Sequence, residues 1–439
     1  MRIKVTLIFL LIILLAKALY SQENADIIVD KNGSGTFTSI QEAIESIPID
    51  NKFFKIILVK NGLYQEKLFI NKSYVAIVGE SKDSTIIQFA ELRKNWMLNN
   101  SSHFGSAVIN IDTNTLNVTL ANLTIHNNYG SLFGDHDHQF AILGFGTKVI
   151  LINCNIIADG ADTVSLWTEK NGMYYHSHCY FEGWVDYVCP RGWCYITDSK
   201  FYGHNLTASL WHKGNDDKNA KFVIRNSFID GVEGFPLGRH HVDAQFFLID
   251  CIFSENMADV PIFWPISPNA KEWIWGERHY YYNCHRVGGD YDWFKNNLNE
   301  AENSLSQEMI DAEWTFDGKW NPEKEMPSVL PFIFLEKPRN GSYNIDLNNI
   351  TLNWVPSRNA ESFNIYFWKS KFPQALKNGE KLKDGPSAIG EQIFVKHQTE
   401  NSFTTNLIEP NSTYYWRVDE IIDGKTIQGK LYHFTTKTN

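Results

Sequence analysis

Three polar residues recur at nearly equal intervals in the middle of the chain: Gln139, Asp162 and Asp186, with steps of 23 and 24 residues. A repeat of roughly 20–30 residues is typical of a solenoid. In a parallel β-solenoid, residues one repeat apart lie about 4.8 Å apart on adjacent rungs. The spacing therefore predicts an amide and two carboxylates in one column on one face. Two carboxylates that close do not easily ionise together, so their pKa values separate and their acid and base roles separate with them.

A short recurring motif predicts the rungs that would position this column. Its form is hydrophobic-x-(Asn/Asp)-(Cys/Ser)-x-hydrophobic, and it occurs as LINCNI at 151–156, YITDSKF at 195–201, VIRNSFI at 223–229 and FLIDCIF at 247–253. The repeats extend over roughly residues 106–265 and favour an all-β solenoid fold. Polar ladders also stabilise such solenoids, so a purely structural role for the column is the alternative.

The flanking segments predict further parts of the fold. Ser39 and Glu42 have capping-box spacing, and the helix that follows would cover the open end of the solenoid. Residues 291–312 have a helical pattern, whereas the C-terminal segments alternate like the strands of a small β-sandwich. We expect a signal peptide at 1–21, a solenoid domain at 22–325, a linker at 326–336 and a sandwich at 337–439.

Composition limits the classes of partner. The chain has 439 residues, 43% of them hydrophobic, which suffices for two or three domains. Arg2, Lys4 and the apolar run Val5–Leu15 are typical of a secretory signal peptide that is too short to span a bilayer comfortably. The net charge of −10 disfavours nucleic acid as a partner. We therefore expect an exported monomer, periplasmic or secreted, without a membrane anchor.

The cysteine pattern leaves two possibilities open. Export permits disulfides, and Cys189 and Cys194 are close enough in sequence to pair. Cys154, Cys179 and Cys251 fall at similar repeat positions, so stacked inward-facing thiols are an equal alternative. A zinc site is not expected, because no CxxC or paired CxxH spacing occurs.

Four motifs occur in order along the chain: GLYQE at 62–66, HQFAIL at 138–143, ADTVSL at 161–166 with VDYVCPRG at 185–192, and LGRHH at 237–241. Together they resemble the motifs of the pectin methylesterases, or pectinesterases, a family of carbohydrate esterases built on a right-handed parallel β-helix. The resemblance spans roughly residues 25–325. It implies a secreted enzyme that hydrolyses the methyl esters of pectin or a related uronate polysaccharide, with no metal or organic cofactor. The segment LIEPNSTYYWRV at 407–418 separately resembles a fibronectin type III domain at its tyrosine corner, with Tyr414 in the corner position.

The resemblance also implies roles for individual residues. Asp186 matches the nucleophile that forms an acyl-enzyme, Asp162 the general acid/base and Gln139 an oxyanion donor. Arg239 matches the partner of the nucleophile, and its guanidinium would keep Asp186 ionised. The residues expected to bind substrate are His241, His240, Trp211, Trp184 and Tyr187.

The sequence departs from the family motifs at several positions. The family's second Gln, just before the first Asp, is Ala161 here, so one expected oxyanion donor is absent. The Trp and Pro of the family's LGRPW motif are His241 and His240. The catalytic column is mostly kept while the substrate-facing positions differ, which leaves the exact polysaccharide open.

Two other functions fit parts of this pattern. One is a β-helix polysaccharide lyase or hydrolase, although inverting hydrolases need carboxylates about 6.5–9.5 Å apart, wider than adjacent rungs predict. The other is a non-catalytic pectin-binding protein, which the loss of an amide at Ala161 would fit. Methanol release separates the esterase from both.

Overall fold

The computed structural model describes residues 25–214, 217–265, 274–325, 334–338, 342–348, 350–357, 360–370, 393–406, 408–422, 424–429 and 431–437. The predicted signal peptide, residues 1–21, and most of the predicted linker lie outside the described residues. Within the described residues, no helix has the length and apolar character needed to cross a membrane.

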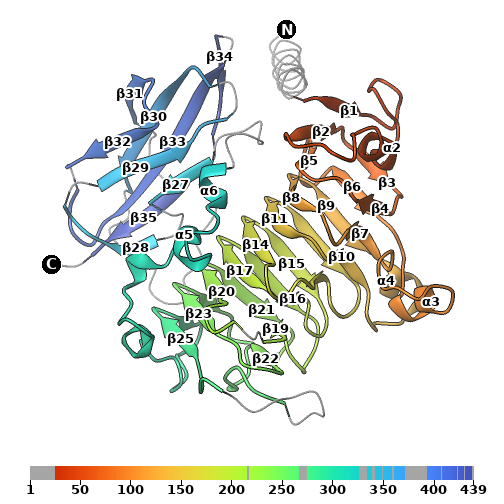
Figure 1. Ribbon diagram of the computed structural model, residues 1–439. Helices are drawn as coiled ribbons and strands as arrows, with labels where there is room; N and C mark the ends of the chain where they lie inside the picture. Colours follow the sequence, from red (N-terminus) through yellow and green to blue (C-terminus); the bar gives the residue numbers. More distant parts are fainter. Residues whose placement is uncertain are drawn as a thin grey trace, which may run out of the picture.

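The chain from Ile27 to Arg286 winds through three parallel sheets that run side by side along one axis (Figure 1). Each complete turn passes through sheet 1, then sheet 2, then sheet 3, and each strand pairs with its counterpart one turn later. The architecture is a parallel β-helix, which confirms the predicted fold class.

The strands are two to six residues long, counted over the described residues. Sheet 1 consists there of β1 (Ile27–Val29), β2 (Lys55–Val59), β5 (Val75–Gly79), β8 (Leu116–Ala121), β11 (Thr147–Ile152), β14 (Met173–Ser177), β17 (Trp193–Thr197), β20 (Phe222–Arg225), β23 (Phe246–Ile249) and β25 (His279–Tyr282). Sheet 2 consists of β3 (Gly62–Tyr64), β6 (Thr85–Gln88), β9 (Thr124–Asn127), β12 (Asn155–Ala158), β15 (Tyr180–Gly183), β18 (Lys200–Gly203), β21 (Phe228–Gly231), β24 (Ile252–Phe253) and β26 (His285–Arg286). Sheet 3 consists of β4 (Leu68–Ile70), β7 (Ala107–Ile111), β10 (Phe140–Gly144), β13 (Val164–Leu166), β16 (Val188–Pro190), β19 (Leu210–His212) and β22 (Gly238–His240).

The recurring Asn/Asp-Cys/Ser motif forms the bend between sheets 1 and 2. Its Asn or Asp takes a left-handed backbone, with φ of 52° at Asn153 and 54° at Asp250. Asn and Asp adopt this conformation more readily than other residues with a side chain. The side chains also bond between rungs: the Asn153 amide donates to the Asn122 amide oxygen at 2.8 Å. The repeat seen in the sequence is therefore the corner of the coil.

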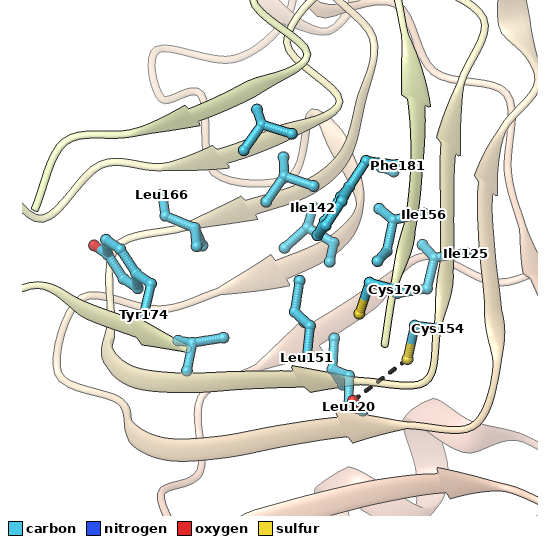
Figure 2. Packing of buried hydrophobic residues seen from close by; sticks show 14 of the residues in the cluster. Leu120, Ile125, Ile142, Leu151, Cys154, Ile156, Leu166, Tyr174, Cys179 and Phe181 are labelled. Carbon is cyan, nitrogen blue, oxygen red and sulfur yellow. Dashed lines mark hydrogen bonds between the residues drawn. The ribbon is translucent and has the colours of Figure 1, made fainter. Parts of the chain in front are cut away.

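Cysteines at this bend form an inward-facing column. Figure 2 shows Cys154 and Cys179 on neighbouring rungs of the apolar interior, with the Cys154 thiol donating to the Leu120 carbonyl at 3.4 Å. All six cysteines are buried and free. The structure thus has the stacked thiols, and the alternative Cys189–Cys194 bridge is absent.

Helix α2 (Ile40–Glu45) covers the N-terminal end of the coil (Figure 1), and Ile40 and Ile44 are buried in the interior cluster. The Ser39 hydroxyl accepts from the Glu42 N–H, as predicted. The Glu66 carboxylate of the GLYQE motif completes the cap by accepting from the Ile40 N–H at 3.2 Å. That motif residue therefore holds the end cap in place.

The predicted helix at 291–312 is wrong. The segment contains two short 3₁₀ turns, η1 (Leu298–Glu300) and η2 (Gln307–Met309), followed by α5 (Ala312–Thr315) and α6 (Pro322–Glu325). Its apolar residues Leu298 and Ile310 pack on the outer face of sheet 1. The pattern of apolar residues reflects this lateral packing. Two further short helices, α3 (Arg93–Met97) and α4 (Tyr129–Phe133), lie in the loops that lead from sheet 2 to sheet 3.

The C-terminal module is mainly antiparallel. One sheet contains β27 (Phe334–Lys337), β29 (Ile350–Val355) and β32 (Ser402–Thr405); the other contains β28 (Ser342–Ile345), β30 (Ser362–Lys369), β31 (Phe394–Gln398), β33 (Thr413–Ile422), β34 (Lys425–Ile427) and β35 (Tyr432–Thr436). Both sheets contribute to one core that includes Trp354 and Trp416. The Tyr414 hydroxyl accepts from the Glu409 N–H at 2.9 Å, the geometry expected of a tyrosine corner. Its fibronectin type III identity and the exact domain boundaries remain predictions.

Candidate active site

Asp162 and Asp186 lie where the chain bends from sheet 2 into sheet 3. Each precedes its strand, β13 or β16, by two residues, and these strands pair in register. The backbone N–H of each aspartate donates to a carbonyl one rung further along at 2.9 Å. Their φ angles are 66° and 54°, in the left-handed region that aspartate tolerates. The two residues therefore hold equivalent positions on adjacent rungs, as the spacing predicts.

Arg239, on β22, binds the Asp186 carboxylate with two hydrogen bonds. Its Nε donates to Oδ1 at 3.1 Å and its Nη2 donates to Oδ2 at 2.7 Å. The side chains are largely shielded, with 21% of Arg239 and 11% of Asp186 exposed. Burial raises the pKa of Asp186, and the hydrogen bonds and charge of Arg239 oppose that rise. The arrangement fixes the direction of the carboxylate and favours its charged form.

Asp162 has a different electrostatic environment. Burial raises its pKa from 3.8 to about 7, and the Asp186 carboxylate adds to the rise, while His138, Arg93 and Arg191 oppose it. His138 Nε2 lies 3.7 Å from Asp162 Oδ2. A proton on Asp162 at neutral pH and a charge on Asp186 are what a coupled acid and nucleophile require.

Gln139 lies next to this pair but is wholly buried. Its side-chain oxygen accepts from the Gly130 N–H at 2.8 Å, and its side-chain nitrogen donates to the Asp135 carbonyl. Gly160 makes this packing possible, because a Cβ there would lie 2.5 Å from Gln139 Nε2. In this conformation the amide holds the loop from α4 to β10, and its predicted role as an oxyanion donor remains a prediction.

Trp211 and His241 lie together beside the site. The Trp211 Nε1–H donates to His241 Nδ1 at 2.7 Å, and both side chains are partly exposed. Trp211 and Arg239 are register partners on β19 and β22, so their side chains lie on the same outer face of sheet 3. The structure thus brings both predicted substrate-binding residues close to Arg239.

The structure corrects two predicted substrate contacts, His240 and Tyr187. His240 follows Arg239 on β22 and points to the opposite face, so it faces inward and is 2% exposed, next to His279. Burial lowers its pKa to about 4, so the ring is neutral. Tyr187 is fully buried in the interior cluster. Neither side chain is available to a sugar in this structure.

Trp184 lies at the bend before β16 on the side of sheet 2. Its ring stacks on His136 at a centroid distance of 3.9 Å and on His204 at 5.7 Å. The side chain is partly exposed, so a contact with a long polysaccharide stays a prediction.

Two arginines near Asp162 were not among the predicted site residues. Arg93 begins α3, and Arg191 follows β16. Both lie over the ring of Trp167, at 5.9 and 4.1 Å from Cζ to the ring centroid. Arg191 could have been found from its place in the VDYVCPRG motif. Arg93 could not, because it belongs to an irregular loop without a repeated spacing.

Among the described residues, no group of three or more His, Cys, Asp or Glu side chains is arranged to hold a metal ion.

Comparisons with known sequences point to one family. The family model described as Pectinesterase matches residues 26–235. Probable pectinesterase 67 of Arabidopsis thaliana is 25% identical over 314 residues, which cover 66% of this chain and 84% of that protein. Probable pectinesterase 55 of the same plant is 30% identical over 226 residues, which cover 49% of this chain and 66% of that protein. The match to the family model ends before Arg239, so the assignment of Arg239 to the site is based on its contacts with Asp186.

Solved structures support the fold. Pectin methylesterase PemA from Erwinia chrysanthemi aligns with a TM-score of 0.53 at 17% identity, covering 68% of this chain and 98% of that one. The pectin methylesterase of Aspergillus niger aligns with a TM-score of 0.53 at 19% identity, covering 67% of this chain and 94% of that one.

Proposed function

The chain belongs to the pectinesterase family of carboxylic ester hydrolases, and on that premise we propose that it removes methyl groups from a pectin-like uronate polysaccharide with Asp186 as the nucleophile. The observation that carries the proposal is the pair of hydrogen bonds from Arg239 to Asp186, one rung from a second carboxylate whose pKa is raised to about 7. A charged carboxylate aimed by a guanidinium and a neighbouring protonated carboxyl are the two groups that acyl transfer needs.

The first half of the reaction forms an acyl-enzyme. An oxygen of Asp186 bonds to the ester carbonyl carbon, and the electrons of the C=O bond move onto the carbonyl oxygen. When they return, the bond from carbon to the methoxy oxygen breaks. Asp162 gives its proton to that oxygen, and methanol leaves. Arg239 keeps Asp186 ionised and oriented before the attack.

The second half restores the enzyme. Asp162, now a carboxylate, takes a proton from water as the water oxygen bonds to the acyl carbon. The tetrahedral species collapses, the bond to Asp186 breaks, and the uronic acid leaves and gives its carboxyl proton to the solvent as free uronate. Asp162 is again protonated and Asp186 again charged, so each turnover consumes one ester and one water.

We also propose that the protein acts outside the cytoplasm as a monomer, either in the periplasm or after secretion. The support is the signal-peptide pattern of residues 1–21 and the polymeric nature of the substrate.

The proposal is tested by methanol release from highly methylated pectin. Asp186→Ala should abolish it, because no other group can form the acyl-enzyme, while circular dichroism and thermal unfolding show an intact fold. Asp259→Ala, a change on a surface loop beyond β24, serves as the control and should keep full activity.

Methanol release that survives in Asp186→Ala contradicts the nucleophile assignment. Unsaturated or reducing ends without methanol would instead indicate a lyase or hydrolase, and binding without any product a non-catalytic protein.

A further inference from the structure

The structure leaves the oxyanion without the amide donors that the family motifs imply. Gln139 is wholly buried, with both ends of its amide bonded to the backbone of Gly130 and Asp135. The second family position is Ala161, which has only a methyl group. Ester hydrolysis nevertheless builds negative charge on the carbonyl oxygen, and removing one donor to that charge typically costs about 10²–10³-fold in rate. A different donor is therefore needed.

His138 lies at the right place to supply one. Its backbone forms a bridge with Ala161 on the next rung, so it is the direct neighbour of the missing amide. Its Nε2 lies 3.7 Å from Asp162 Oδ2, close to the reacting groups. Its side chain is 41% exposed, in contrast to the buried Gln139, so a substrate can reach it.

Asp137 orients the His138 ring. Its Oδ1 lies 2.5 Å from His138 Nδ1, so Nδ1 carries a hydrogen and donates it. Nε2 then carries a second hydrogen when the ring is an imidazolium. A charged N–H donor forms a shorter and stronger hydrogen bond to an oxyanion than a neutral amide does.

We propose that His138, held by Asp137, donates from Nε2 to the developing oxyanion and so replaces the amide donors of the family. The inference rests on the function proposed above. As Asp186 bonds to the carbonyl carbon, the C=O electrons move onto oxygen, and the Nε2–H shortens its contact with that oxygen. When methanol departs the electrons return and the hydrogen bond weakens. His138 transfers no proton, so Asp162 remains the acid and base. His138 is a catalytic residue in this scheme, and Asp137 is a positioning residue.

Charged groups of both signs surround the His138 ring. Asp137 and Asp162 contact it, and Asp186 interacts with it at longer range. Arg93, Arg191 and His103 are also near, and the pKa of His103 is lowered by burial and by those arginines.

The first test is a set of substitutions assayed by methanol release from pectin. His138→Ala should lower kcat about 10²–10³-fold with little change in KM, and Asp137→Asn about tenfold. Adding Ala161→Gln to His138→Ala should restore much of the lost kcat by returning an amide to the family position. His138→Gln, a milder change, should keep part of the rate. His285→Ala is the matched control, because His285 forms a comparable exposed pair with Asp290 at 2.9 Å on β26, and it should not alter kcat.

The second test separates a hydrogen-bond donor from a structural support. The Tm of His138→Ala should stay close to that of the wild type, and the loss should appear in kcat with little change in KM. A merely structural role of His138 would lower the Tm, and an amide at position 161 would not restore the rate. Full kcat in His138→Ala, or a loss that Ala161→Gln fails to restore, overturns the inference while Asp186→Ala remains inactive. A wild type that releases no methanol overturns the proposed function itself and this inference with it.

Discussion

The two carboxylates of the site differ in their partners. Both oxygens of Asp186 accept hydrogen bonds from one guanidinium, whereas Asp162 has the His138 ring at 3.7 Å. Hydrogen bonds to a charged form favour that form, and burial without them favours the neutral one. Two residues of the same type therefore acquire opposite roles from their surroundings.

We expect kcat/KM to fall as the pH rises above about 7. Asp162 must carry a proton to release methanol, and its pKa is raised to about 7. The measurement is kcat/KM between about pH 4 and 9. Asp162→Asn should be nearly inactive at every pH, and a wild-type profile that stays flat above pH 7 would remove the acid role.

The same group should also make stability depend on pH. Its pKa in the folded state lies above the unfolded value of 3.8, so the stabilisation is complete at low pH and is lost as the pH rises through about 7. The Tm of the wild type minus that of Asp162→Asn should decline over this window. A constant difference would contradict the raised pKa.

Replacing Arg239 should shift the acid limb of the profile. Arg239→Ala removes the two hydrogen bonds that favour charged Asp186, so its pKa should rise and activity should be lost at a higher pH than in the wild type. Arg239→Lys keeps a charge but loses the bidentate geometry, and a smaller shift with a lower kcat is expected. An unchanged acid limb in both variants would mean that Arg239 does not control Asp186.

At the scale of the structural elements, the corner residues determine the register of the rungs more than the strands do. The strands of sheet 3 that follow Gln139, Asp162 and Asp186 contain only three to five residues, too few to fix a register alone. The corner residues fix it, because a left-handed residue recurs at the bend between sheets 1 and 2 from Asn122 to Asn283. It is Asn or Asp on every one of these rungs except that of His178, and Asn153 bonds to Asn122. A regular corner keeps every later side chain of the turn on its correct face.

Asn153 offers a matched test of this corner. Asn153→Ala should lower the free energy of unfolding by about 1–2 kcal/mol, because alanine is strained at φ of 52°. Asn153→Gly accepts that backbone and loses the 2.8 Å hydrogen bond, so a smaller loss is expected. Urea unfolding measures both. If glycine costs as much as alanine, the lost hydrogen bond and not the backbone conformation is the main contribution.

At the scale of the whole molecule, the proposed catalytic residues and the C-terminal module occupy different faces of the β-helix. The proposed catalytic residues lie on sheet 3 and at its edge, whereas the C-terminal module contacts sheet 1, where Val355 joins the cluster on its outer face. The Tyr432 hydroxyl also contacts His178 Nε2 at 2.5 Å, directly after β14. In Figure 1 the module lies beside sheet 1 next to α5 and α6. A change in the contact between the C-terminal module and sheet 1 should therefore leave catalysis unaffected.

Tyr432→Phe provides the test of that separation. Loss of the hydroxyl should lower the stability by about 1 kcal/mol and leave kcat/KM of methanol release unchanged, because the contact is on sheet 1. Thermal unfolding and the esterase assay give the two numbers. A lower kcat/KM would connect the module to the site.

The sequence predicts the solenoid and the charged core of the site because both depend on regular spacing. Asp162 and Asp186 recur with the rungs, so their proximity follows from counting, whereas Arg239 is predicted from the resemblance of LGRHH to a family motif. The inward turn of His240 also follows from strand alternation, once Arg239 is known to face outward. The burial of Gln139 does not, since it depends on the loop from α4, whose path no repeat specifies. Arg93 belongs to a similar loop, and the apolar pattern of 291–312 fits lateral packing as well as a helix.

The buried thiols have a consequence for how the molecule opens. Cys154 and Cys179 lie in the middle of the coil, whereas Cys251 and Cys284 lie near its C-terminal end, and all of them are shielded from water. Each turn of a solenoid is held mainly by the turns on either side, so the ends separate before the middle. The reactivity of the six thiols therefore reports how far the coil has opened. A thiol reagent in solution would modify Cys284 as the last turns fray, and it would reach Cys154 only after the coil has come apart.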